Sequence, residues 1–119
     1  MAGFRAELKR LRHTCIWSWQ GWRAAWVDEV SLRHWVRLQV ASVLLALLVP
    51  MTPGERALIV ALGFLVIAAE LFNSAIEVIV DMISPDPHPM AGRAKDIGSA
   101  AVAVTAIGTG IAWAIILLG

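Results

Sequence analysis

Three apolar runs, at residues 32–49, 57–83 and 97–118, limit what this chain can fold into. A helix that crosses a bilayer needs about 20 mainly apolar residues, and the second and third runs reach that length. The first run is shorter and has Arg33 and Arg37 near its beginning. It is still expected to cross, because long arginine side chains can extend back to the membrane surface. The sequence therefore predicts an all-α membrane protein that forms a single domain over residues 1–119.

An amphipathic helix is expected before these runs, at residues 4–30. Its apolar residues recur at steps of three or four, and its basic residues lie off that stripe. A tryptophan-bearing apolar stripe beside basic side chains is typical of a helix lying in the lipid headgroup layer. The stripe consists of Phe4, Leu8, Leu11, Cys15, Trp19, Trp22 and Trp26.

The distribution of lysine and arginine predicts the orientation in the membrane. Basic residues cluster before the first run and again at Arg93 and Lys95, within an expected polar loop at 84–96, whereas the turn between the first two runs has only Arg56. The positive-inside rule places the N-terminus and the 84–96 loop in the cytoplasm, and the C-terminus on the periplasmic side. The formal net charge of +1 gives no reason to expect a nucleic-acid partner.

The run 57–83 contains the segment "ELFNSAIEVIVD", which is unusually polar for its surroundings. Glu70, Asn73, Glu77 and Asp81 fall within a sector of about 80° of a helix. Ionisable groups inside a membrane are costly and normally face a partner or a cavity. Neither of the other runs offers a cation at comparable depth, which leaves a bound divalent cation, a proton relay, or a stripe that lies closer to the surface.

The cytoplasmic end of this stripe suggests phosphoryl transfer. Glu77 is near that end, within reach of soluble metal and nucleotide, while Glu70 lies deeper, where a lipid hydroxyl would be. Lys95 and Asp96 follow in the next polar segment. Phosphoryl transfer needs a metal, a cation on the phosphates and a base for the attacking hydroxyl, and Mg²⁺ is bound through one or two carboxylates. Basic residues at such an end are, however, usually topological anchors.

Glu29 offers a further carboxylate at the end of the N-terminal helix. It could fold towards the second run and share a metal with Glu77. The simpler interpretation, an acidic helix end beside Asp28, is slightly favoured by periodicity alone.

Three motifs carry a resemblance to a known family. They are "WSWQGWRAAWVDE" at 17–29, "ELFNSAIEVIVD" at 70–81 and "GRAKDIGSAAV" at 92–102. In these motifs, and over nearly its whole length, the sequence resembles the small integral-membrane diacylglycerol kinases of Gram-negative bacteria. The undecaprenol kinases of Gram-positive bacteria share the Glu-Asn-Glu pattern and remain the alternative, but the first and third motifs are more similar to the diacylglycerol enzymes.

The resemblance implies a homotrimer in the bacterial inner membrane, with three transmembrane helices and one surface helix per chain. It implies MgATP-dependent phosphorylation of the primary hydroxyl of diacylglycerol to phosphatidate, by direct transfer without a phosphoenzyme. The sites would be shared between subunits.

By position, the resemblance also assigns individual roles. Glu70 would be the catalytic base, Glu29 and Glu77 would hold Mg²⁺, and Asn73 would support them. The implied nucleotide-binding residues are Arg10, Trp17, Glu29, Glu77, Asp86, His88, Lys95 and Asp96, and the implied substrate-binding residues are Arg10, Glu70, Ser99 and Trp113. Two departures affect these roles. Prolines 85, 87 and 89 flank Asp86 and His88, and Met82 replaces an expected basic residue after Asp81.

Two other classes of protein stay open on the sequence alone. A small oligomeric proton or ion conductor would use the intramembrane acids as a relay, but it has no role for Lys95 and Asp96. A structural membrane subunit would use the stripe to fix assembly, but it would not require Glu29. Small residues recur along the third run at spacings that let helices approach closely. Three helices alone can bury few faces, so association with other copies is expected.

Overall fold

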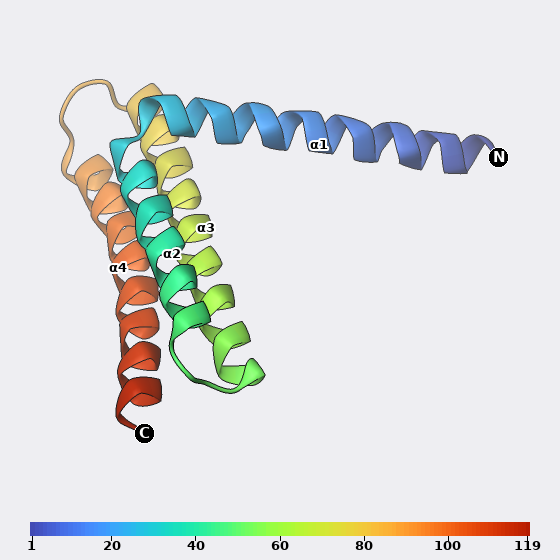
Figure 1. The fold of residues 1–119 in the computed structure, drawn as a ribbon. Coiled ribbons are helices and arrows are strands. Elements are labelled where there is room, and N and C mark those ends of the chain that lie inside the picture. Colours follow the sequence, from blue (N-terminus) through green and yellow to red (C-terminus); the bar gives the residue numbers. More distant parts are fainter.

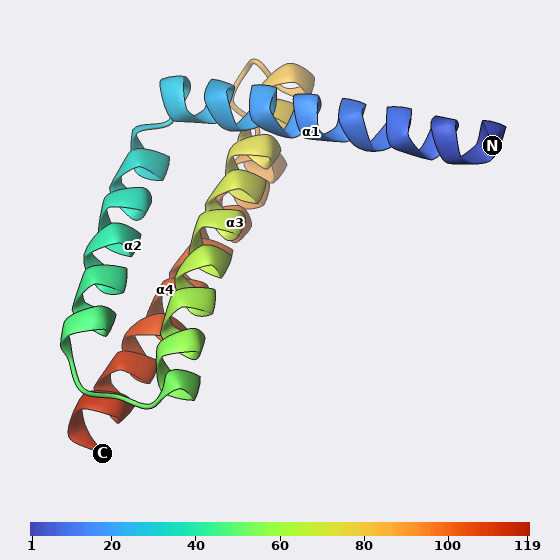
Figure 2. The same ribbon diagram turned by 45° about the vertical axis from the view of Figure 1, so that its right-hand side comes forward.

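The computed structural model describes residues 1–119 as four helices without strands. They are α1 (Ala2–Asp28), α2 (Val30–Leu48), α3 (Pro53–Ile83) and α4 (Pro89–Leu118). Helices α2, α3 and α4 run side by side, and α1 projects from one end of this bundle at a steep angle (Figures 1 and 2). α3 is central: it packs on both α2 and α4, whereas no Cα atoms of α2 and α4 come within 8 Å of each other.

The break between α1 and α2 is a single extended residue, Glu29, with φ −110° and ψ 103°. Arg33, in the first turn of α2, donates through Nη1 to the backbone oxygens of Trp26 and Val27 in the last turn of α1. These bonds satisfy carbonyls that a helix end leaves free. The surface helix expected at 4–30 thus ends at Asp28, and the side chain of Arg33 fixes α1 to α2.

The turn between α2 and α3 is closed by local hydrogen bonds. Thr52 and Glu55 form a capping box, with Thr52 Oγ1 accepting from the Glu55 amide at 3.1 Å and Glu55 Oε1 accepting from the Thr52 amide at 2.8 Å. Pro53 occupies the first turn of the helix, where its missing N–H costs nothing. These two features start α3 at Pro53, four residues before the expected beginning of the second run.

The polar loop expected at 84–96 is shorter in the structure, because α4 begins at Pro89. Nδ1 of His88 accepts from the Met90 amide at 3.0 Å and caps the helix. A proline at the first helical position is favourable, so the last of the three prolines starts a helix instead of preventing one. Lys95 and Asp96 consequently lie on α4 and not in a loop.

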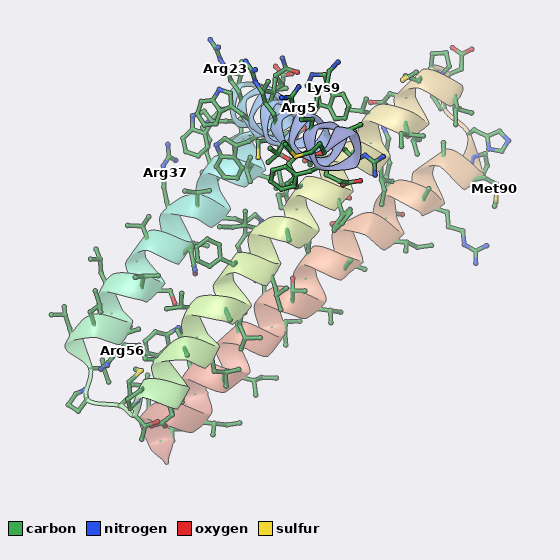
Figure 3. The ribbon with its side chains drawn as sticks, turned by 90° about the vertical axis from the view of Figure 1, so that its right-hand side faces the viewer. Arg5, Lys9, Arg23, Arg37, Arg56 and Met90 are labelled. Atoms are coloured by element: carbon green, nitrogen blue, oxygen red, sulfur yellow. The ribbon has the colours of Figure 1, made fainter.

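Two helices, α3 and α4, are long and apolar enough to cross a membrane by length and composition. α2 does not meet the same criterion, so three crossings per chain stay a prediction. Arg5, Lys9 and Arg23 lie near the end of the bundle that carries α1, and Arg56 lies near the opposite end (Figure 3). Only 12 of the 119 residues are buried, so most large apolar side chains of the bundle face outwards.

Close approach of α2 to α3 depends on a glycine. Gln39 of α2 is buried and donates through Nε2 to the backbone oxygen of Val60 at 3.1 Å. A Cβ atom at Gly63 would lie 1.6 Å from Gln39 Oε1, so no larger residue fits there without displacing the amide. The polar side chain of Gln39 thereby finds a partner inside an apolar bundle.

Candidate active site

Carboxylates from two parts of the chain meet in a cleft of about 310 Å³. Its walls come from α2, α3, α4 and the residue between α1 and α2. The structure brings together five residues that the sequence singled out, namely Glu29, Glu70, Asn73, Glu77 and Ser99. The remaining lining residues are Ser31, Trp35, Val102 and Ala103.

α3 supplies the polar wall of the cleft. Glu70, Asn73 and Glu77 share one face because they are three and four residues apart. Glu70 is 5% exposed and Asn73 is 7% exposed, whereas Glu77 is half-buried. Asn73 donates through Nδ2 to Glu77 Oε1 at 3.4 Å, and its Oδ1 has no hydrogen-bond partner. The amide thus lies against Glu77 and keeps an acceptor free.

Gly98 of α4 lies against the side-chain amide of Asn73. The sequence pattern did not single out this glycine. A Cβ atom at Gly98 would lie 2.4 Å from Asn73 Oδ1. Since real Cβ atoms do not come so close to an oxygen, any other residue would push the amide away from its position. The only signal in the sequence was a glycine directly before Ser99 inside an apolar run.

Glu29 lies at the mouth of the cleft, outside the apolar runs. Burial raises the pKa of its carboxyl group, and the negative charges of Glu77 and Asp28 raise it further. A carboxylate whose proton affinity is raised by a neighbouring negative charge is typical of a site that a cation would neutralise. Glu29 is therefore both the helix-end acid beside Asp28 and a neighbour of Glu77.

The donor set fits Mg²⁺. Neither Glu29 nor Glu77 has an ion-pair partner among the chain's basic residues. No group of three or more His, Cys, Asp or Glu side chains is arranged to hold a metal. Mg²⁺ usually needs only one or two protein carboxylates, and it takes its other oxygens from phosphates and water. Glu29 and Glu77 would therefore leave the remaining coordination positions of Mg²⁺ to phosphate oxygens and water.

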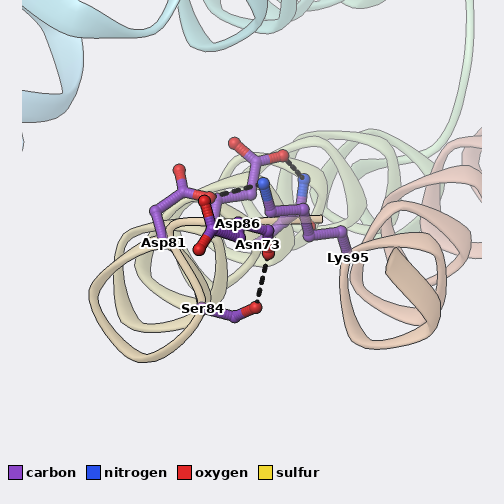
Figure 4. A network of polar contacts seen from close by, with 6 residues as sticks. Asn73, Asp81, Ser84, Asp86 and Lys95 are labelled. Atoms are coloured by element: carbon purple, nitrogen blue, oxygen red, sulfur yellow. Dashed lines mark hydrogen bonds and ion pairs between the residues drawn. The ribbon is translucent and has the colours of Figure 1, made fainter. Parts of the chain in front are cut away.

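Lys95 lies just beyond the cleft. Its Nζ is 2.6 Å from Oδ1 of Asp81, which makes an ion pair between α4 and α3 (Figure 4). Asp81, the last member of the α3 stripe, does not line the cleft, and neither does Asp96, which is exposed.

The structure does not bring the two predicted residues of α1 to this cleft. Arg10 precedes Glu29 by 19 residues, which is about 28 Å of helix, and pairs with Glu7 at 3.5 Å. Trp17 is also far along α1, where its ring is 5.7 Å from that of His13. Contact of either residue with the contents of its own cleft would need a large movement of α1.

Three other predicted residues also lie away from the cleft. Asp86 and His88 belong to the short connection between α3 and α4, where His88 caps α4. Trp113 follows Ser99 by 14 residues, about 21 Å along α4. Its Nε1 donates to Ser42 Oγ at 2.9 Å and links α4 to α2 beside a separate cavity of about 180 Å³.

Comparison with known proteins identifies relatives of this chain. The family model described as prokaryotic diacylglycerol kinase matches residues 16–117. The chain is 42% identical over 112 residues to a diacylglycerol kinase of Pseudomonas aeruginosa, covering 94% of this chain and 91% of that protein. It is 37% identical over 117 residues to the diacylglycerol kinase of Escherichia coli K12, covering 98% and 96%. A Helicobacter pylori diacylglycerol kinase is 34% identical over 110 residues, covering 92% and 86%.

Proposed function

The chain belongs to the prokaryotic diacylglycerol kinase family, and from this premise we propose that it phosphorylates diacylglycerol with ATP to give phosphatidate. The observation that carries the proposal is the cleft in which Glu29, Glu70, Asn73 and Glu77 meet. It combines a buried carboxylate with two carboxylates nearer the mouth, and these are the parts that transfer of a phosphoryl group to a lipid alcohol requires.

The transfer is a direct, in-line displacement. The oxygen of the primary hydroxyl of diacylglycerol forms a bond to the γ-phosphorus, and the bond from that phosphorus to the β–γ bridging oxygen breaks. ADP leaves with that oxygen, and the hydroxyl proton passes to the carboxylate of Glu70. Glu70 is suited to this task because it is the most buried acid of the cleft, so that it meets a lipid hydroxyl before bulk water.

Glu29 and Glu77 would hold the Mg²⁺ that accompanies ATP. When bound, Mg²⁺ neutralises charge on the phosphates. Asn73 orients Glu77 through its side-chain amide. Lys95, one turn beyond the cleft on α4, supplies the positive charge for the phosphates, with Asp96 beside it as a further contact to the nucleotide.

We place the protein in the bacterial inner membrane, with α2, α3 and α4 as crossing helices and α1 on the cytoplasmic surface. Three copies form the active unit. Sharing of sites is supported by the direction of α1, which projects away from the bundle (Figure 1). It carries Arg10 and Trp17 far from the cleft of their own chain. Exposing the carboxylates of the cleft to lipid acyl chains would also be unfavourable, and an adjacent copy of the chain would shield them.

The test is transfer of labelled γ-phosphate from ATP in mixed micelles that contain diacylglycerol and a polyprenol side by side. Labelled phosphatidate is the expected product, and its formation should require Mg²⁺. A labelled polyprenyl phosphate instead would identify an undecaprenol kinase. No labelled lipid at all would contradict kinase activity and favour an ion conductor or an assembly subunit.

A further inference from the structure

Asp81, the ion-pair partner of Lys95, has no role in the proposed reaction. We propose that Asp81 is a positioning residue, which holds the ammonium group of Lys95 at the mouth of the cleft, ready for the phosphates of ATP. This inference rests on the proposed kinase function and adds a residue to its machinery.

The pair bridges α3 and α4 directly next to the cleft. Asp81 follows Glu77 by four residues on α3, and Lys95 precedes Ser99 by four residues on α4. Residues four apart share one face of a helix and are about 6 Å apart along its axis. Both partners therefore continue the polar walls of the cleft by one turn, where nucleotide from the cytoplasm would enter.

The chemistry of lysine explains why such a partner is useful. Lys95 has a flexible four-carbon stem and three donor hydrogens, and its side chain is 40% exposed. One donor is used by Asp81 at 2.6 Å, which leaves two for phosphate oxygens. No other basic side chain pairs with Asp81, and the next residue, Met82, is apolar and exposed. Asp81 and Lys95 thus form an ion pair only with each other.

Positioning predicts a particular division between binding and catalysis. Asp81 is itself negative, so its removal does not weaken the general attraction of the site for ATP and can even strengthen it. Removing the Asp81 carboxylate does, however, free the Lys95 side chain to move. Its ammonium group then spends less time beside the γ-phosphoryl group being transferred, so kcat falls. A merely structural pair would change neither quantity, because exposed ion pairs contribute little to stability.

The experiment compares Asp81→Ala and Asp81→Asn with the wild type in the full-length protein, measuring kcat and the Kd for MgATP in mixed micelles. Asp81→Ala is expected to lower kcat on the order of tenfold, with an unchanged or tighter Kd. Asp81→Asn should lose less, because its amide keeps an acceptor oxygen. The control Met82→Asn, one residue along, should retain wild-type kcat. Unchanged kcat in Asp81→Ala, or weaker MgATP binding, would overturn the proposal.

A second measurement tests the pair without relying on catalysis. Lys9 and Lys95 are the only lysines of the chain, so acetylation of Lys95 can be measured by mass spectrometry with Lys9 as an internal reference. In the absence of nucleotide, Asp81→Ala should raise the modification rate of Lys95 relative to Lys9 several-fold. An unchanged ratio would contradict the restraint, even if diacylglycerol were not the substrate. Absence of phosphatidate from the wild type would instead count against the kinase function.

Discussion

Glu70 and Glu77 carry the same carboxyl group on one face of one helix, yet their surroundings differ. Glu70 is almost fully buried, while Glu77 is half-buried and contacts the amide of Asn73. A buried acid can take a proton from a hydroxyl that arrives from the lipid, whereas an acid near the mouth can meet a hydrated metal. The different burial of the two carboxylates therefore supports the different roles proposed for them.

Replacing the deeper acid should remove catalysis without removing the nucleotide. We expect Glu70→Gln to lower kcat by roughly 10²–10⁴-fold, the usual contribution of a general base. Binding of MgATP, measured by equilibrium titration, should stay close to that of the wild type. Equal loss of turnover and of MgATP affinity would contradict Glu70 as the base.

Replacing the outer acid should act on binding itself. Glu77→Gln removes one of the two carboxylates that would hold Mg²⁺, so MgATP affinity should fall, and raising the Mg²⁺ concentration should restore part of it. The same titration measures this effect. An affinity that does not change would rule out the metal role.

Gly98 gives a test of the support behind Glu77. In Gly98→Ala the new Cβ atom would lie 2.4 Å from Asn73 Oδ1, so the amide must move and Glu77 loses its donor. We expect kcat/KM to fall about tenfold or more. Gly108→Ala is the matched control on the same helix, because a Cβ atom there meets nothing within 4 Å. Equal activity of the two variants would show that the contact at Gly98 is unimportant.

At the scale of helices, the relation of α1 to the bundle is set by few interactions. Glu29 is the whole connection, and Arg33 holds the last turn of α1 through two backbone oxygens. Because Glu29 also lines the cleft, the angle of α1 and the position of this carboxylate are linked. Helix α1 is thus connected to the candidate site through one residue.

Loss of the Arg33 contact should loosen α1. In Arg33→Gln, spin labels on the exposed Cys15 and on Met82→Cys should show a broader distance distribution than in the wild type, and His34→Gln is the neighbouring control. The long guanidinium stem spans the gap to α1, and glutamine is too short to do so. Equal widths in both variants would mean that other contacts hold α1.

The sequence predicted the helices better than their junctions. Hydropathy and the spacing of Glu70, Asn73 and Glu77 were enough to place α3 and its polar face, because these patterns are local. The start of α4 was missed, since a proline ends one helix or begins another depending on the cap before it, here His88. The roles of Arg33 and Gly98 depend on which helices touch, and no spacing within one helix contains that information.

At the scale of the whole molecule, the direction of α1 decides which cleft its residues can reach. Arg10 and Trp17 are too far along α1 to reach the cleft of their own chain, so any contact with nucleotide or lipid there would be made in a neighbour. A homotrimer with such exchange would pair the α1 of one copy with the cleft of the next.

Mixing two defective chains tests this arrangement. One chain carries Arg10→Ala and Trp17→Ala, and the other carries Glu70→Gln. If α1 serves the neighbouring cleft, random co-reconstitution restores about a quarter of the sites with both parts intact. The measured quantity is phosphatidate formation relative to each variant alone. Activity no higher than the average of the two separate preparations would show that α1 and the cleft act within one chain.

The scarcity of buried residues has a consequence for handling this protein. Because only 12 of the 119 residues are buried, the isolated chain lacks the hydrophobic core that stabilises a soluble domain. Detergent, lipid or other copies of the chain must cover the outward-facing apolar side chains. Each of these binds the native state and stabilises it in a concentration-dependent way. A melting temperature obtained for this protein will therefore change with the amphiphile and its concentration, and it describes the assembly of protein and amphiphile together.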